Sequence, residues 1–479
     1  MVGFVYAVGR RFRWAQALAC LMAMSTPAWA QENLDLDTAL GYALKRNRNL
    51  VRLALSLEGS QIGVGAAESE FSVRVAPDGD LDFSNDRDAR QYGLLGSKRF
   101  ILGTDVQLRG DVSEIDPQDG EEFRRGTLSI RIEQPLFRNF GRLIHGESIL
   151  QAQQTLKTAR RTYHQQMANL IVDVVQSFET ILLLEGQIRS DEAFFVRMDK
   201  LYKLTRAREK QGHTSRVDTL RVELDRGQAL SRLEVTRERL SFNQREFAEL
   251  LGFDPETIFL LEPPRLIEFE IPALEESVKV GLANRMDYAQ VLQDHEDTYR
   301  GIKIARRGLY PDLGLVTRYE RFGEGRTFSE ATDFGEDSWF VGLGANVELN
   351  PVRDRAAISR AVVDEKSARE TIQIVELNVA REIQQQVTAY RRAQADLRIV
   401  GRNLKLSEDR AKLARRLFEA GRGDNFSVTD AEESYLEAES RRLAARAEAS
   451  VSGYRLLRAL GTLIDFPKEL KPKAKVGES

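Results

Sequence analysis

The sequence predicts a mixed fold of α-helices and transmembrane β-strands, with two tandem structural repeats in one chain. Three observations predict it: the same order of parts occurs twice, several short segments alternate between apolar and polar residues, and two long proline-free stretches have helical periodicity. Self-similarity over so long a span indicates two copies of one large block, each needing the other to close a surface. Neither half is therefore expected to fold as a free domain.

The repeat consists of matching residues at two constant offsets, with the second copy starting near Leu274. The early pairs, 238 residues apart, are Leu36 and Leu274, Ala43 and Gly281, and Ala67 and Ala305. The later pairs, 209 residues apart, are Ile149 and Ile358, Ala152 and Ala361, Ala159 and Ala368, Arg160 and Arg369, Gly212 and Gly421, Glu223 and Glu432, Leu251 and Leu460, and Gly252 and Gly461. These pairs predict a first repeat over residues 31–271, which ends in a proline-rich connector, a second repeat over 272–466, and a polar tail over 467–479.

Residues 1–30 are predicted to be a cleaved signal peptide. Three arginines within residues 10–13 give a positive start, Trp14–Met24 is an apolar run, and Ala28–Ala30 is a small-residue cleavage signature. An uncleaved membrane anchor is the alternative, but this run is well short of the roughly 20 residues that a helix needs to cross a bilayer. The mature protein is therefore expected to be exported.

The only cysteine, Cys20, lies inside this segment. A lipoprotein with Leu18-Ala19-Cys20 as its lipidation box is the alternative, but only about six apolar residues precede that cysteine, fewer than an export signal needs. Cleavage after Ala30 leaves no cysteine, which excludes disulfides and thiolate metal sites from the mature chain. The four histidines lack the local spacing of a zinc site, so no metal and no cofactor are expected.

Composition argues against nucleic-acid binding and gives no support to an enzyme. The chain has 70 basic and 73 acidic residues, and phosphate binding needs a clear basic surplus. No nucleophile elbow, phosphate loop or dinucleotide glycine motif occurs in a strand-to-helix context. A content of 30% charged and 8% aromatic residues is typical of long solvated helices rather than thick globular cores.

Beyond the signal, no stretch reads as a transmembrane helix, since even Leu170–Leu184 carries charged residues, so a membrane crossing requires strands. In Ser338–Leu349 every second side chain is apolar, and Asp312–Phe322 alternates less cleanly. Gly323–Asp337 between them reads as an exposed loop. The first copy has four strand-like segments, Phe71–Phe83, Tyr92–Phe100, Thr104–Asp111 and Thr127–Glu133. This alternation predicts a membrane barrel, with a soluble β-sandwich as the alternative.

The first copy contains about one β-hairpin more than the second. From Ala67 to Pro135 the chain runs 68 residues, whereas the matching stretch from Ala305 to Pro351 has 46. The excess of 22 places the added hairpin around Leu102-Gly103, and a further seven residues are added after the first proline. We therefore expect six strands per chain, unless the hairpin folds outside the membrane or into the lumen.

Each strand set is followed by a long helical hairpin. Apolar residues recur at helical spacings after Leu156. No proline occurs between Leu136 and Phe253 or between Val352 and Asp465. Only Gly212 and, in the second copy, Gly421 are expected to interrupt the helices. An isolated soluble coiled coil is the alternative for such helices taken alone.

Together, the export signal, the duplicated order of parts and the phrase Glu133–Phe137 before a helix resemble the TolC-like outer-membrane efflux and secretion channels. The family pattern at the helical turn is similar to Gly212–Asp218 and Gly421–Asp430. The resemblance covers nearly the whole mature chain. It implies a homotrimer in which strands from three chains share one outer-membrane β-barrel, continued by the paired helices as a periplasmic α-barrel. The physics agrees, because six strands cannot close a channel-sized barrel alone.

The resemblance implies a passive exit duct of a tripartite efflux or type I secretion system rather than an enzyme. The implied partners are two further copies of the chain, outer-membrane lipid, a periplasmic adaptor protein and an inner-membrane pump of the ABC or RND type. The alternative is a periplasmic or surface coiled-coil scaffold whose strands form a soluble cap.

The resemblance also implies a pore constriction near the helical turns. The two acidic positions of the family, three residues apart, fall on Ser427 and Asp430, and only the aspartate is retained. Asp218 and Asp424 are the other candidates, because a carboxylate repeated three times around an axis forms a cation-selective ring. The serine at 427 speaks against a two-layered ring. The alternative role for Asp218 and Asp430 is to cap or solvate helix starts, where acidic residues are favoured.

Overall fold

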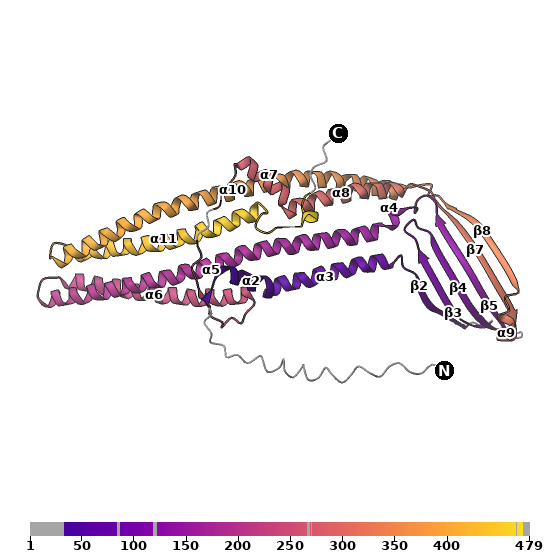
Figure 1. Cartoon of the computed structure of the whole chain (residues 1–479), viewed down its shortest axis with the longest axis horizontal. Coiled ribbons are helices and arrows are strands. Elements are labelled where there is room, and N and C mark those ends of the chain that lie inside the picture. The colour runs from indigo at the N-terminus through magenta and orange to yellow at the C-terminus, as the bar shows by residue number, and fades with distance from the viewer. Residues whose placement is uncertain are drawn as a thin grey trace. The chain divides into compact units, whose positions relative to one another are not determined.

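The computed structural model describes residues 33–83, 87–117, 122–265, 269, 271–465 and 467–472. The predicted signal peptide and Cys20 lie outside the described residues. The chain forms two compact units, and each unit draws segments from both halves of the sequence (Figure 1). The first unit contains Leu170–Phe269, Ala389–Tyr454 and the residues up to Arg48, and the second contains Asn49–Asn169, Glu270–Thr388 and the residues from Arg455 onward.

The first unit is built around the two helical hairpins, which are confirmed. Its helices are α2 (Leu36–Arg46), α6 (Arg216–Leu251), and parts of α5 (Glu147–Lys210), α10 (Val352–Glu419) and α11 (Asn425–Ala459). In this unit the short strands β1 (Asn33–Leu34) and β6 (Leu260–Leu261) form a parallel pair. All four hairpin helices supply one core: Phe194, Met198, Leu201, Val222, Ala229, Phe418, Val428 and Leu436.

The helices break at the predicted glycines because the backbone turns left-handed there. Gly212 and Gly421 have φ values of 75° and 73°. At the first turn the N–H of Gly212 donates to the carbonyl of Glu209, and the N–H of His213 donates to the carbonyl of Arg208. The same pair of bonds closes the helix before Gly421. This ending satisfies the last helical carbonyls and favours glycine, which has no Cβ to clash in this conformation.

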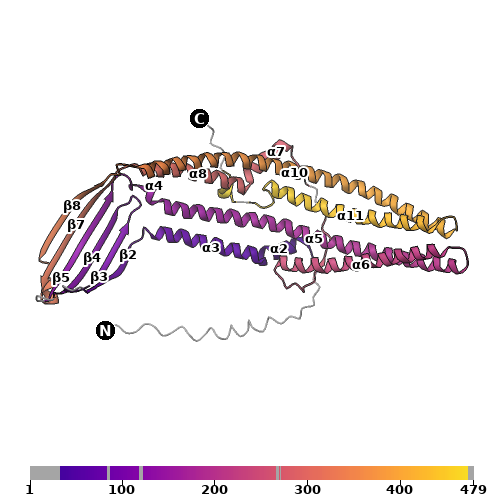
Figure 2. The ribbon, with the colours of Figure 1, turned by 180° about the vertical axis from the view of Figure 1, so that it is seen from behind.

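The second unit holds an antiparallel sheet that confirms the six predicted strands. The strands are β2 (Arg74–Phe83), β3 (Arg87–Arg99), β4 (Asp105–Pro117), β5 (Phe123–Pro135), β7 (Asp312–Gly325) and β8 (Glu336–Asn346), in the order β2-β3-β4-β5-β7-β8 (Figure 2). The helices α3 (Arg48–Ser69), α4 (Arg142–His145), α7 (Leu274–Asn284) and α8 (Met286–Arg307) connect to it. The added hairpin, β3 and β4, lies within the sheet.

Gly323–Asp337, predicted to be an exposed loop, is mostly exposed, but the prediction that it is only a loop was wrong. The strand β7 continues to Gly325, and Phe328–Ala331 forms the short helix α9, started by a capping box of Thr327 and Glu330. Ala331 is fully buried, and its carbonyl oxygen packs against Gly126 and Gly323 of the sheet. A Cβ added to Gly126 or Gly323 would lie 2.4 or 2.7 Å from this oxygen, so the close packing needs glycine at both positions. The strand β8 also ends at Asn346, before the last three predicted residues.

Two further sequence expectations need correction. The helix α5, which contains Leu170–Leu184, does include a window long and apolar enough to cross a membrane, but half of that window is buried inside the structure, as in a core helix. The start of the predicted polar tail is packed rather than free: Leu470 is buried with Met286 and Ile464, and its carbonyl accepts a hydrogen bond from Arg161 Nε at 3.3 Å. One apolar side chain therefore anchors an otherwise polar segment.

Candidate pore constriction and membrane surface

The two helical turns lie together and define the helical tip, residues 205–218 and 418–430. Arg208, in the last turn of α5, donates to the carbonyl of Phe418 at 3.1 Å, and its guanidinium lies 4.3 Å from the ring centroid of that residue. Thr205 Oγ1 donates to Asn425 Oδ1 at 3.2 Å. A cation at the carbonyl end of α10 also offsets the negative end of that helix. All three predicted aspartates therefore lie at one tip.

Asp218 and Asp424 belong to two capping pairs with the residue types exchanged. At the start of α6, Ser215 accepts from the N–H of Asp218 at 3.2 Å and donates to its carboxylate at 2.6 Å. At the start of α11, Asp424 accepts from the N–H of Ser427 at 2.8 Å. Hydrogen bonds from the Ser427 side chain and backbone lower the pKa of Asp424. The serine at 427 therefore occupies the position that corresponds to Asp218.

Asp430 makes an ion pair rather than a cap. Its carboxylate contacts a terminal nitrogen of Arg410 in α10, and Arg410 also donates to Ser434 Oγ at 3.1 Å. The side chains of Asp430 and Arg410 are 46% and 55% exposed. Both groups are solvated, so the tip carries an exposed carboxylate and an exposed guanidinium. Substitution of either residue would change the net charge of the tip.

The sequence analysis missed a buried charge cluster beside the tip. Glu432 in α11 is 1% exposed and lies 2.6 Å from Arg197 Nε in α5 and 3.1 Å from Arg415 Nε in α10. Arg197 also stacks on Tyr435, at 5.4 Å from the ring centroid. Glu432 had appeared only as a repeat pair with Glu223, which is exposed in the first copy. The identity of the two residues therefore did not indicate that one of the two carboxylates is buried between two arginines.

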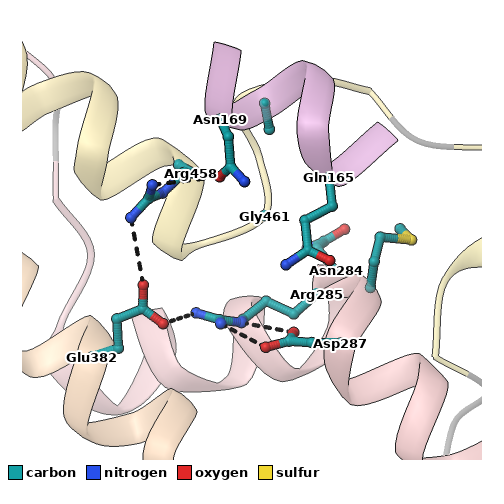
Figure 3. A pocket seen from close by; sticks show the side chains of 10 residues that line it. Gln165, Asn169, Asn284, Arg285, Asp287, Glu382, Arg458 and Gly461 are labelled. Atoms are coloured by element: carbon teal, nitrogen blue, oxygen red, sulfur yellow. Dashed lines mark hydrogen bonds and ion pairs between the residues drawn. The ribbon is translucent and has the colours of Figure 1, made fainter. Parts of the chain in front are cut away.

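A second charged cluster surrounds a cavity of about 200 Å³ in the second unit. Arg285, between α7 and α8, contacts Asp287 at 2.7 Å and Glu382 at 2.5 Å, as Figure 3 shows. Arg458 lies 3.8 Å from Glu382 and 3.4 Å from Asn169 Oδ1. Each charged group of the cluster thus faces an opposite charge, which suits a packing role. Among the described residues, no group of three or more His, Cys, Asp or Glu side chains could hold a metal ion.

The six-stranded sheet has one apolar and one polar face. Side by side across the apolar face stand Val75, Gly96, Leu108, Ile130, Tyr319 and Trp339. Across the polar face the next row is Ala76, Leu95, Arg109, Ser129, Glu320 and Ser338. Trp339 is 74% exposed and Val75 is 71% exposed, so no part of the chain that the structure describes covers the two ends of this apolar row. On the apolar face, charged residues such as Lys98 and Arg124 stand near strand ends.

Comparison with known structures shows the same fold in outer-membrane channels. The chain is similar to the outer membrane protein VceC of Vibrio cholerae, with 17% identity, a TM-score of 0.69, and coverage of 89% of this chain and 96% of that chain. It is similar to the CmeC outer membrane channel of Campylobacter jejuni, with 12% identity, a TM-score of 0.70, and coverage of 90% and 86%. For the MtrE outer membrane channel of Neisseria gonorrhoeae the values are 13%, 0.67, 89% and 89%. Identities this low establish the fold alone.

A family model described as outer membrane efflux protein matches residues 278–462. The predicted family resemblance is thereby confirmed for these residues, which lie within the second predicted repeat. Proteins of this family are outer-membrane channels rather than enzymes, and the predicted location in the outer membrane, with a large periplasmic helical part, is confirmed at the level of the family. A comparison with curated protein sequences finds no match.

Proposed function

We propose that this chain is the outer-membrane exit duct of a tripartite efflux or type I secretion system, working as a homotrimer. Three chains would join their sheets into one barrel, with the helical hairpins continuing the passage on the periplasmic side. A periplasmic adaptor and an inner-membrane pump of the ABC or RND type would deliver the cargo and the energy. The duct itself would hydrolyse nothing.

The observation that carries this proposal is a two-faced sheet with two open edges. In the sheet formed by the described strands, β2 and β8 each have a single neighbour, so their outer backbone groups lack partners within this sheet. Lipid offers no hydrogen bonds, so an open edge cannot persist in a membrane. Since all five pairings are antiparallel, β2 and β8 run in opposite directions, and β8 of one copy can pair with β2 of the next. Closing the ring in this way satisfies both edges.

Cysteine cross-linking tests the shared barrel, because the only cysteine of the sequence, Cys20, lies in the predicted signal peptide. Val75→Cys in β2 is combined in turn with Val341→Cys and Leu343→Cys in β8, on the same face of the sheet. Four strands separate the two edges within one chain, so any disulfide must join different chains. We expect oxidation in the membrane to give reducible covalent dimers and trimers, and each single variant to stop at dimers or monomers. Monomers throughout, in a protein that stays soluble without detergent, would favour the scaffold.

The carboxylate of Asp430 is proposed to line the constriction. We expect Asp430→Ala to change ion conductance in planar bilayers and to weaken block by divalent cations, because the substitution removes three carboxylates from the ring and leaves the three Arg410 cations unpaired. Glu437→Ala is the matched control, since it also removes a carboxylate from an exposed ion pair of α11, with Arg441, but lies seven residues further along the helix from the tip. Currents that are the same in wild type and Asp430→Ala would show that the ion pair has only a structural role.

A further inference from the structure

The two segments that the first half of the chain has in excess contact each other. The turn between β3 and β4 is closed by a hydrogen bond from Phe100 N to the carbonyl of Thr104 at 2.8 Å. The N–H of Gly141, in the longer segment after Pro135, donates to the carbonyl of Leu102 at 3.0 Å. The two insertions thus form one structural feature, in which the α4 segment holds the turn of the added hairpin.

Close packing fixes the position of this turn. Gly103 has a φ of 98°, and a Cβ added to it would lie 2.4 Å from His145 Nε2 in α4. His145 is in turn held by a 2.6 Å contact between its Nε2 and the carbonyl of Asn139. A left-handed backbone and the lack of a side chain are both needed here, so only glycine fits. The turn is therefore held against α4, at the end of the strands from which the chain continues into the helices.

The added hairpin is part of the sheet wall rather than a loop over either face. It pairs with β2 along ten residues of β3 on one side and with β5 along eleven residues of β4 on the other. Its faces are also in phase with those of its neighbours: Leu94 and Leu108 stand on the apolar face, and Arg109 and Asp111 stand on the polar face. A hairpin folded into the lumen or outside the membrane would break both the pairing and this alternation.

From these observations, and resting on the proposed trimer, we infer that the barrel is a wide exit that admits hydrated polymers. The second half of the chain supplies two strands and the first half supplies four, so three chains give eighteen strands, where two strands from each half would give twelve. With strands about 4.8 Å apart and tilted by about 40°, the backbone diameter is about 36 Å for eighteen strands and about 24 Å for twelve. Rings of the larger size enclose aqueous channels.

The polar face of the hairpin suits a passage for large hydrated cargo rather than a charge filter. Arg109 contacts Asp78 at 2.5 Å and Asp111 at 3.4 Å, and Arg99 contacts Asp105 at 3.5 Å. Opposite charges therefore pair along the polar face of the hairpin, so the hairpin adds no strong charge of one sign to the lumen. The hairpin therefore widens the ring without adding a charge filter of its own.

Polymer exclusion in planar bilayers tests the width. Poly(ethylene glycol) chains of graded size are added to one side at a time, and the conductance of the wild-type channel is recorded. The comparison channel lacks residues 84–119, a deletion that joins β2 to β5 and leaves four strands per chain. We expect the wild-type channel to admit, at the barrel end opposite the helical hairpins, polymers that are too large for the deletion channel. The expected ratio of the excluded polymer radii is about 1.5, as for the two rings.

Imaging of the wild-type channel in lipid gives a second measurement, which stands even if the deletion variant does not assemble. A membrane ring of about 36 Å backbone diameter supports the inference, and a ring of about 24 Å overturns it. Equal polymer exclusion by both channels also overturns it. In either of these cases a trimeric membrane channel would remain, whereas a monomeric, detergent-free protein would instead contradict the proposed function.

Discussion

Replacing Ile130 by arginine should prevent the chain from assembling in the outer membrane, whereas arginine at the adjacent Ser129 should be tolerated. Ile130 stands on the apolar face between Leu108 and Tyr319, in a row without charge. An arginine on the lipid face near the midplane costs about 2–4 kcal/mol, which is roughly 6–12 kcal/mol for the three chains of a trimer. This is comparable to the whole stability of an ordinary domain.

Ser129 is a matched control because it is one residue away and points to the polar face. Its neighbours across the sheet are Arg109 and Glu320, so an added arginine meets water and a carboxylate there. The measurement is the amount of trimer that stays in the outer-membrane fraction after washing with urea. Equal trimer from the two variants would mean that the apolar face does not contact lipid, and the barrel model would fail.

The period-two alternation was enough to predict the sheet because it reflects the same two faces that the structure shows. The two strands of the second copy were predicted from this alternation and the four of the first copy as strand-like segments, although the observed ends differ by up to several residues. The helical turns were equally readable, since Gly212 and Gly421 adopt the left-handed backbone that favours glycine. Features that depend on a single chain segment and its own chemistry were therefore accessible from the sequence.

Features that depend on distant partners were not accessible. The helix α9 packs on the sheet because Gly126 and Gly323, from different halves of the chain, stand opposite each other in the β5–β7 register. No local pattern fixes this register. The exchanged capping pairs were hidden for a similar reason: the aspartate caps directly at 424, whereas at 218 it supports a serine cap. The contacts show that the serine and the aspartate at positions 215 and 218 of the first copy stand in the reverse order at 424 and 427 of the second, and that they make the same capping contact.

The carboxylate of Glu432 should be the most sensitive charged group in the helical tip. Its substitution by leucine leaves Arg197 and Arg415 facing each other without a counter-charge, and side chains of these arginines are only 20% and 37% exposed. Breaking a buried ion pair on one side costs about 3–5 kcal/mol. We expect the amides of α10 and α11 near the tip to exchange with solvent deuterium at least roughly a hundredfold faster, which corresponds to about 3 kcal/mol of lost local stability.

Glu223→Leu is the matched control, because Glu223 occupies the corresponding position of the first copy and is exposed. It should leave exchange almost unchanged, since exposed carboxylates contribute little. The triple variant Arg197→Met, Glu432→Leu and Arg415→Met separates charge from packing: a buried ion cluster replaced entirely by apolar side chains is often tolerated, so exchange protection should largely return. If Glu432→Leu and Glu223→Leu behave alike, the cluster does not hold the two hairpins together at the tip, and the exposed pair of Asp430 and Arg410 becomes the stronger candidate for that role.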